Sequence, residues 1–290
     1  MAFSSGQVST EGSAVKRYTG VASVFVRGIN PNKEELEKFF NRELDNDPEY
    51  VSTVESGSEN IPQVRIDILV EADPDKYEDS LKSRVTFFLR KRHVFTRDNS
   101  KVRVIDKYGY PGWATKEELA SHAQLKSANG KNMRISTSYR PAYEGEVELI
   151  DFLKCYLNIP EALSYVNGEW TSNKRYKPED CEACLEHIED FFKGDVKELK
   201  NIISYQPNNK VKVLFGVRTA NDGKQYQTSF TRMFLKNNVS DYSKLDAEVK
   251  RVQESGVLST SEFTVGELKE YTVTPTDFEQ IEPVTDTPWG

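Results

Sequence analysis

The chain has 290 residues, of which 37% are hydrophobic and 29% charged, and its formal net charge is −7. This composition is typical of a soluble globular protein, and no apolar run approaches the roughly 20 residues that a membrane-spanning helix needs. The length suffices for one large domain or two small ones. Residues 1–17 are rich in Ser, Gly and Thr and lack an apolar secretion signal, so we expect a flexible leader.

Period-two alternation of apolar side chains predicts half-buried strands in the first half of the chain. Residues 63–70 are the clearest case, because Arg65 and Asp67 share one face while four aliphatic side chains share the other. The other elements expected before residue 110 are a strand at 21–27, a helix at 36–44, and a hairpin of 84–89 and 101–105 around a turn at 96–100.

The second half of the chain begins with a block of helices and returns to strands. Residues 210–218 alternate and are followed by Asn221-Asp222-Gly223, which predicts a hairpin with 225–236. A last strand is expected at 263–273, with a bulge or turn at Gly266. Helices are expected at 145–157, 177–192, 195–203 and 245–254.

Strands, then helices, then strands again favour one mainly β (α+β) domain over two independent domains. We predict an OB-type Greek-key barrel at residues 18–273, with a helical insertion at about 145–205. An α+β sandwich is the alternative, and the number of predicted strands does not separate the two.

Basic residues are concentrated at 82–107, where nine Lys and Arg oppose two Asp and give a net charge of +7. A solvated charged face is the alternative explanation, but aromatic residues are interleaved with the bases. A surface that binds single-stranded nucleic acid needs aromatic rings and cations together, because bases stack on the rings while the cations neutralise phosphates. The residues predicted to bind it are Arg84, Phe88, Arg90, Lys91, Arg92, Phe95, Arg97, Lys101, Arg103 and Lys107.

Three large aromatic residues, Tyr108, Tyr110 and Trp113, follow in a run rich in Gly and Pro. A rigid loop does not easily bury all three, so we predict that some are exposed stacking platforms. The alternative is a Tyr/Trp corner packed on the barrel.

A similar mixture recurs at 210–236, and its predicted DNA contacts are Lys212, Arg218, Arg232 and Lys236. Here core packing competes with a binding role, because Tyr226, Phe230 and Phe234 share one parity.

The three cysteines, Cys155, Cys181 and Cys184, together with His187, supply a Cys₃His set that zinc sites use. Cys181 and Cys184 also fall at helical spacing with apolar neighbours, which favours buried thiols. An odd, low cysteine count without a secretion signal indicates a reducing compartment. We therefore expect neither a bound metal nor a cofactor.

Motifs of common enzymes are missing from the sequence. It contains no GxxxxGK[ST] phosphate loop, no GxSxG elbow and no HExxH helix. Three histidines without an evident constellation offer few candidates for acid–base catalysis. We therefore expect a protein without enzymatic activity.

Residues 274–290 form an acidic tail with three prolines and no basic residue. Such a composition predicts disorder in the free protein. The tail can imitate phosphates in a basic groove, or dock an aromatic residue into a partner's pocket. The predicted partner-docking residues are Asp277, Phe278, Glu279, Glu282, Asp286 and Trp289.

Residues 207–219, 226–236 and 262–278 resemble the single-stranded DNA-binding proteins of tailed bacteriophages, especially the crAss-like phages of gut Bacteroidetes. The resemblance runs from about Lys101 to the C-terminus. It implies an OB-fold protein that coats single strands and recruits replication and recombination proteins in the cytoplasm of the infected bacterium. It also implies an acidic tail that ends in an aromatic residue. Trp289 resembles that residue, but one further residue, Gly290, follows it.

These observations together predict sequence-independent binding of single-stranded DNA. The main alternative is a phage structural or virion-packaged protein whose strands form protein interfaces. A nuclease or other DNA-modifying enzyme comes third.

Overall fold

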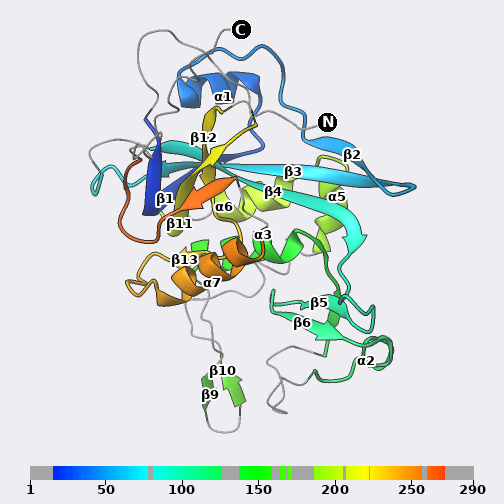
Figure 1. Cartoon of the computed structure of the whole chain (residues 1–290). Helices are drawn as coiled ribbons and strands as arrows, with labels where there is room; N and C mark the ends of the chain where they lie inside the picture. The colour runs from blue at the N-terminus through cyan, green and yellow to red at the C-terminus, as the bar shows by residue number, and fades with distance from the viewer. Residues whose placement is uncertain are drawn as a thin grey trace, which may run out of the picture.

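The computed structural model describes residues 16–77, 81–125, 137–158, 164–166, 169–171, 186–204, 207–221, 223–256 and 260–271. Within them the chain is mainly β, with one large antiparallel sheet, two small ones and several helices (Figure 1). The long strands of the large sheet cross the molecule, and a three-stranded sheet lies apart from them beside α2.

The large sheet has the strand order β12-β11-β1-β3-β4-β8. These strands are β1 (Tyr18–Ile29), β3 (Glu59–Ala72), β4 (Lys82–His93), β8 (Tyr143–Glu144), β11 (Lys210–Thr219) and β12 (Gln225–Ser229). Four shorter strands join it at the sides: β2 (Val51–Ser56) on β3, β13 (Leu235–Lys236) and β14 (Ser261–Phe263) on β11, and β15 (Lys269–Glu270) on β1. The sheet curls, so that β12 comes close to β4.

The concave face of the sheet carries the main core. Alternate residues of β1, β3, β4 and β11 point into it, as their period-two pattern predicts. Three helices cover this inner face: α3 (Glu146–Tyr156), α5 (Ile188–Phe191) and α6 (Lys197–Ser204). Phe152 of α3 is fully buried and meets Phe87 of β4 edge to face at 5.8 Å.

The outer face of the sheet is covered unevenly. Helix α7 (Ser243–Glu254) packs Leu245 and Val249 against Val21 of β1 and Leu214 of β11. Helix α1 (Lys33–Phe40) lies beside β4, where Lys82 sits over the Phe39 ring at 5.3 Å.

A second unit follows β4 in the chain and has its own small core. It consists of the sheet β6-β5-β7, formed by β5 (Val102–Asp106), β6 (Pro111–Ala114) and β7 (Tyr139–Pro141), together with helix α2 (Lys116–Ser121). A further two-stranded sheet pairs β9 (Ser164–Val166) with β10 (Glu169–Thr171).

Several predicted elements are confirmed, including the strands at 21–27, 63–70 and 210–218, and the helices α3, α6 and α7. The hairpin after β11 is also present, but its second strand, expected at 225–236, is two strands, β12 and β13. The expected last strand is instead two short ones, β14 and β15, interrupted around Gly266. The helix expected at 36–44 begins earlier and ends at Phe40, because Asn41 adopts a left-handed conformation (φ 50°). The helix expected at 177–192 falls largely outside the described residues. Of this segment, the described residues include one helix, α5.

One larger expectation is wrong. The segments 84–89 and 101–105 do not form one hairpin of the barrel, because β4 pairs with β3 and β8 whereas β5 pairs with β6 and β7. The chain does reverse at 96–100, but only the bridge Phe95↔Val102 joins the two sides. The helical segment expected at about 145–205 is described only in part, and its helix α3 packs on the inner face of the sheet.

None of the helices in the described residues is long and apolar enough to cross a membrane.

Candidate nucleic-acid interface

The outer face of β4 presents a row of alternating side chains: Arg84, Thr86, Phe88 and Arg90. The residues between them point into the core and are buried. Strand β3 lies alongside and places Arg65 directly opposite Phe88. The alternation therefore sets one aromatic ring among three guanidinium groups on the outer face.

Exposed large hydrophobic side chains are rare in the described part of the chain. They are Phe95, 49% exposed, Phe88, 45% exposed, and Val51, 38% exposed. Both rings lie in the segment 82–107, where the sequence predicts stacking platforms. Val51 pairs with the inward-facing Val64, and it therefore lies on the opposite face of the sheet from Phe88.

A buried carboxylate organises the cations beside Phe88. Asp67 is 1% exposed and accepts a hydrogen bond of 2.8 Å from the Thr86 hydroxyl. Arg84 donates to its Oδ2 at 3.3 Å, and Arg65 Nε forms an ion pair with the same oxygen at 3.4 Å. Asp67 thus fixes two guanidinium groups on neighbouring strands while neutralising only one of them.

A third guanidinium, that of Arg42, completes what we call the arginine cluster (Arg42, Arg65 and Arg84). Burial lowers the pKa of Arg42, and the neighbouring charge of Arg84 lowers it further. The Arg42 Nε is buried and has no hydrogen-bond partner among the described residues. Like charges held together in this way are stabilised by an incoming anion, and guanidinium groups bind phosphate oxygens well.

Aromatic rings support the arginine cluster. Arg42 and Arg84 lie over Phe40 at 5.3 and 5.7 Å from the ring centroid, and Arg65 lies over Tyr50 at 5.2 Å. Such cation–π contacts hold the guanidinium planes in place. Phe40 is positioned because α1 starts at an Asn32 capping box and ends at Asn41.

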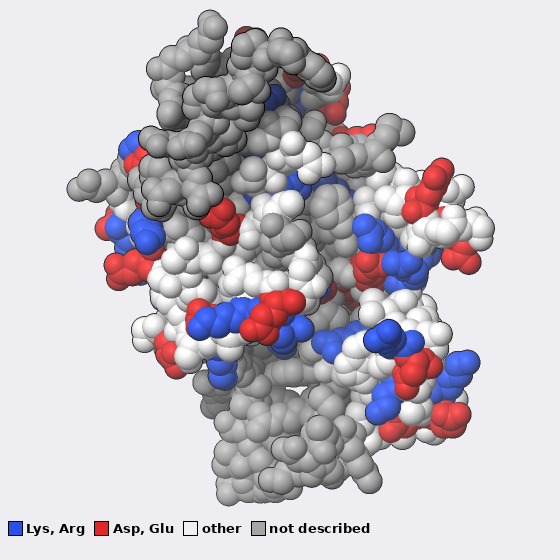
Figure 2. All heavy atoms as spheres, in the orientation of Figure 1, with Lys and Arg blue, Asp and Glu red and all other residues white. Residues whose placement is uncertain are grey.

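The far half of β4 carries cations that already have acidic partners. Arg90 and Arg92 both bind Glu144 of β8, at 2.7 and 2.6 Å, and Lys91 binds Glu189 of α5 at 2.6 Å. These three predicted contacts therefore compete with carboxylates for any phosphate. Figure 2 shows the same interspersion of basic and acidic side chains over the visible face.

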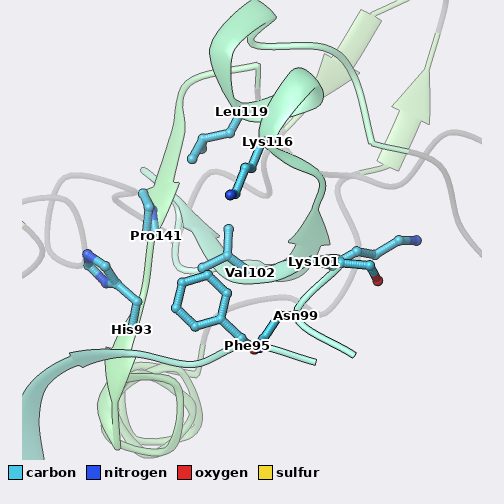
Figure 3. A pocket seen from close by; sticks show the side chains of 9 residues that line it. His93, Phe95, Asn99, Lys101, Val102, Lys116, Leu119 and Pro141 are labelled. Atoms are coloured by element: carbon cyan, nitrogen blue, oxygen red, sulfur yellow. The ribbon is translucent and has the colours of Figure 1, made fainter. Parts of the chain in front are cut away.

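The turn after β4 carries the next predicted residues, Phe95, Arg97 and Lys101, and all three are exposed. Neither Arg97 nor Lys101 has an ion-pair partner among the described residues. Phe95 and Lys101 line a cavity of about 250 Å³ together with residues of β5, β7 and α2 (Figure 3).

The predicted aromatic loop is part of the small sheet and none of its three rings is fully exposed. Tyr108, Tyr110 and Trp113 are each half-buried, because Trp113 lies in β6 and Tyr110 packs on the small core. A cation covers each ring: Lys107 over Tyr108 at 4.9 Å, Lys154 over Tyr110 at 4.0 Å and Arg103 over Trp113 at 5.2 Å. The packed corner describes these rings better than free platforms do.

The cations predicted at 210–236 lie away from β4. The Lys212 ammonium donates to the Val239 carbonyl and to the Tyr242 hydroxyl, and Arg232 pairs with Glu148 at 2.9 Å. Arg218 is exposed over Tyr226, and Lys236 lies in β13. β1 and β3 separate β11 from β4, so the structure does not bring these four residues to the outer face of β4.

The remaining predicted sites are only partly visible. All six tail residues, Asp277, Phe278, Glu279, Glu282, Asp286 and Trp289, lie outside the described residues, as do Cys181 and Cys184. Cys155 is buried on α3 and its thiol donates to the Phe234 carbonyl, while His187 pairs with Asp190. The described residues contain no group of three potential metal ligands.

Sequence reasoning missed three members of this surface. Arg65 carried a signal, because it is a polar residue on the outward parity of an alternating strand, but it lies outside the basic segment. Arg42 and Tyr50 lie between α1 and β2 in a stretch without periodicity, and nothing in the sequence places them beside β3.

Comparisons with known proteins found no matching family model, no matching curated protein and no matching solved structure.

Proposed function

We propose that this chain is a non-enzymatic protein that binds single-stranded DNA across the outer face of β3 and β4. The observation that carries the proposal is the Phe88 ring, 45% exposed in the middle of a sheet face and flanked by arginines. An exposed ring offers a base a stacking partner, and the adjacent guanidinium groups meet the flanking phosphates.

The order of the strands supports an OB-type barrel. β1, β3 and β4 form an antiparallel meander, α3 follows, and the hairpin β11–β12 returns so that β11 pairs with β1 and β12 approaches β4. OB-type barrels bind single strands on the face of their second and third strands. In this chain those strands are β3 and β4, which carry Arg65 and Phe88.

Contacts of this kind do not depend on the base sequence. Every base has a face that stacks on a ring, and every nucleotide has a phosphate. We therefore propose sequence-independent coating of single strands in phage replication and recombination, in the cytoplasm of the infected bacterium.

The acidic tail fits the same proposal in two roles: it competes with DNA for the arginine cluster, and it recruits partner proteins. Residues 277–290 carry four acidic side chains and no base. They offer the arginine cluster a weak substitute for phosphates, and they leave the cluster when DNA binds. The released tail then recruits replication and recombination proteins.

One observation favours the alternative of a structural or virion-packaged protein. Strand β2 pairs only with β3 among the described strands, so its other edge can accept a strand from a partner protein.

A fluorescence titration separates the two functions. We expect labelled oligo(dT) to bind at low salt and an equally long duplex to compete poorly, because its bases are already stacked. Absence of oligo(dT) binding at low salt would refute the DNA-binding proposal, and equal binding of both DNAs would refute the role of base stacking.

A further inference from the structure

We propose that the cavity between the end of β4 and the small sheet holds one unstacked base of the bound strand. This inference rests on the proposed function and adds a second, separate base site to it. The cavity measures about 250 Å³. It lies between the curled sheet, which contributes His93 at the end of β4, and the small sheet β6-β5-β7.

The walls of the cavity suit a flat, largely apolar group. Phe95, Val102, Leu119 and Pro141 line it, and they come from the turn after β4, from β5, from α2 and from β7. Figure 3 shows the Phe95 ring beside Val102, with Leu119 and Pro141 on the other sides of the same space. Phe95 is 49% exposed, so one face of its ring is free to stack.

The rim of the cavity is positively charged. Lys101 and Lys116 line it, and neither ammonium group has an ion-pair partner among the described residues. Figure 3 shows Lys116 directed into the space and Lys101 extending outward from its edge. The two lysines therefore differ from Arg90, Lys91 and Arg92, whose charges are already paired with carboxylates. Phosphates on either side of an inserted base therefore find free cations here.

Two nearby carboxylates, Asp98 and Glu117, stay ionised and oppose part of this charge, but neither forms an ion pair with Lys101 or Lys116 among the described residues. Asp98 accepts bonds from the hydroxyls of Thr96 at 2.6 Å and Ser100 at 2.8 Å, and these bonds lower its pKa to about 2. On α2, the bonds that Glu117 accepts from its own backbone N–H and from Thr115 lower its pKa.

The cavity is formed before any ligand arrives. The Thr96 and Lys101 backbones bond across the turn at 2.9 Å, and the bridge Phe95↔Val102 closes its base. A capping box at Thr115 fixes the start of α2, where Lys116 is the first residue. A preformed pocket costs little ordering entropy when a base enters.

The position of the cavity connects it to the β3–β4 face. Phe95 follows Phe88 by seven residues, which is at most about 23 Å at roughly 3.3 Å per strand residue. The pairing register of β4 shifts between Arg90 and His93, so the strict alternation of faces ends before Phe95. We infer that a DNA strand that lies on Phe88 and runs along β4 continues to Phe95, where a base contacts the aromatic wall and its phosphates meet both lysines.

Photo-crosslinking tests this inference. Oligo(dT) with 5-iodo-deoxyuridine at one position is bound, irradiated and mapped on the protein by mass spectrometry. We expect crosslinks at both Phe88 and Phe95. Phe95→Ala should weaken oligo(dT) binding by a factor between about 5 and about 150, the contribution of one stacked base, and Phe95→Trp should preserve binding. Lys116→Gln should reduce the magnitude of the salt slope by about 0.7.

The outcomes distinguish the two proposals. A crosslink at Phe88 without one at Phe95, together with unchanged affinity in Phe95→Ala, overturns the base pocket alone. Absence of oligo(dT) binding overturns the proposed function and the pocket with it. Because the Phe95 side chain is half exposed, Phe95→Ala should keep the thermal unfolding midpoint of the native chain, and this is measured as the folding control.

Discussion

Replacing Phe88 by alanine should weaken binding of single-stranded DNA without unfolding the protein. The ring is 45% exposed and its strand neighbours Phe87 and Leu89 are buried, so the core stays intact when the ring is removed. Surface substitutions of this kind change stability by within about 0.5 kcal/mol. The loss of one stacked base costs about 1–3 kcal/mol of binding free energy, a factor of about 5 to about 150 in the dissociation constant.

The assay is a titration of labelled oligo(dT) at fixed low salt, and three variants make it specific. Phe88→Leu keeps an apolar side chain but removes the ring, and it should lose nearly as much affinity as Phe88→Ala. Phe88→Trp should retain affinity. Val51→Ala, which removes an exposed apolar side chain from the opposite face, should bind like the native chain. Equal losses in Phe88→Ala and Val51→Ala, or no loss in Phe88→Ala, would refute the stacking role.

Three further predictions address stability and regulation. Burial opposes a low pKa for Asp73, but hydrogen bonds from Lys210 and a backbone N–H lower it below 3.8. The resulting stability is present above that value and lost as pH falls through the folded pKa, so the free energy of unfolding should drop below about pH 4 and drop less in Asp73→Asn. Gly145→Ala should lower the free energy of unfolding by at least about 2 kcal/mol, because φ is +85° and a Cβ would lie 2.1 Å from the Phe88 carbonyl oxygen; Gly57→Ala, with open space around it, should cost less in the same denaturation experiment. Deleting residues 277–290 should tighten oligo(dT) binding if the tail competes for the arginine cluster, whereas unchanged affinity in the same titration would leave the tail only a docking role.

Local sequence patterns predict which segments form strands and helices better than they predict which strands pair with each other. Alternation gives β3, β4 and β11 and tells which side chains face the core, because one buried face imposes a period of two. The same alternation does not tell which strands pair. Residues 96–100 reverse the chain as their composition predicts, but β5 then pairs in the small sheet and not with β4. That choice depends on the small core around Val104 and Leu125, whose members are distant in sequence.

The candidate site is predictable in part for the same reason. The alternation of aromatic and basic residues on one strand predicts Phe88 and Arg84 as site residues. The basic segment was overestimated, since Glu144 and Glu189 neutralise part of it from positions about 50 and 100 residues further along the chain. Arg42 was missed because only the packing of α1 against the sheet places it beside Arg84.

Salt dependence of oligo(dT) binding tests the central claim most directly, with Arg42→Gln as the decisive variant. Arg42 has no carboxylate partner among the described residues, so its removal leaves Asp67 paired with Arg65 and Arg84. If about six phosphates are neutralised, log affinity should fall with log salt at a slope near −4, and Arg42→Gln should reduce its magnitude by about 0.7.

Lys250→Gln removes an equal charge on α7, where Lys250 pairs with Asp246, and it should leave the slope unchanged. Undetectable binding at low salt, or one common slope for the native chain and both variants, would contradict the assignment of this face to DNA.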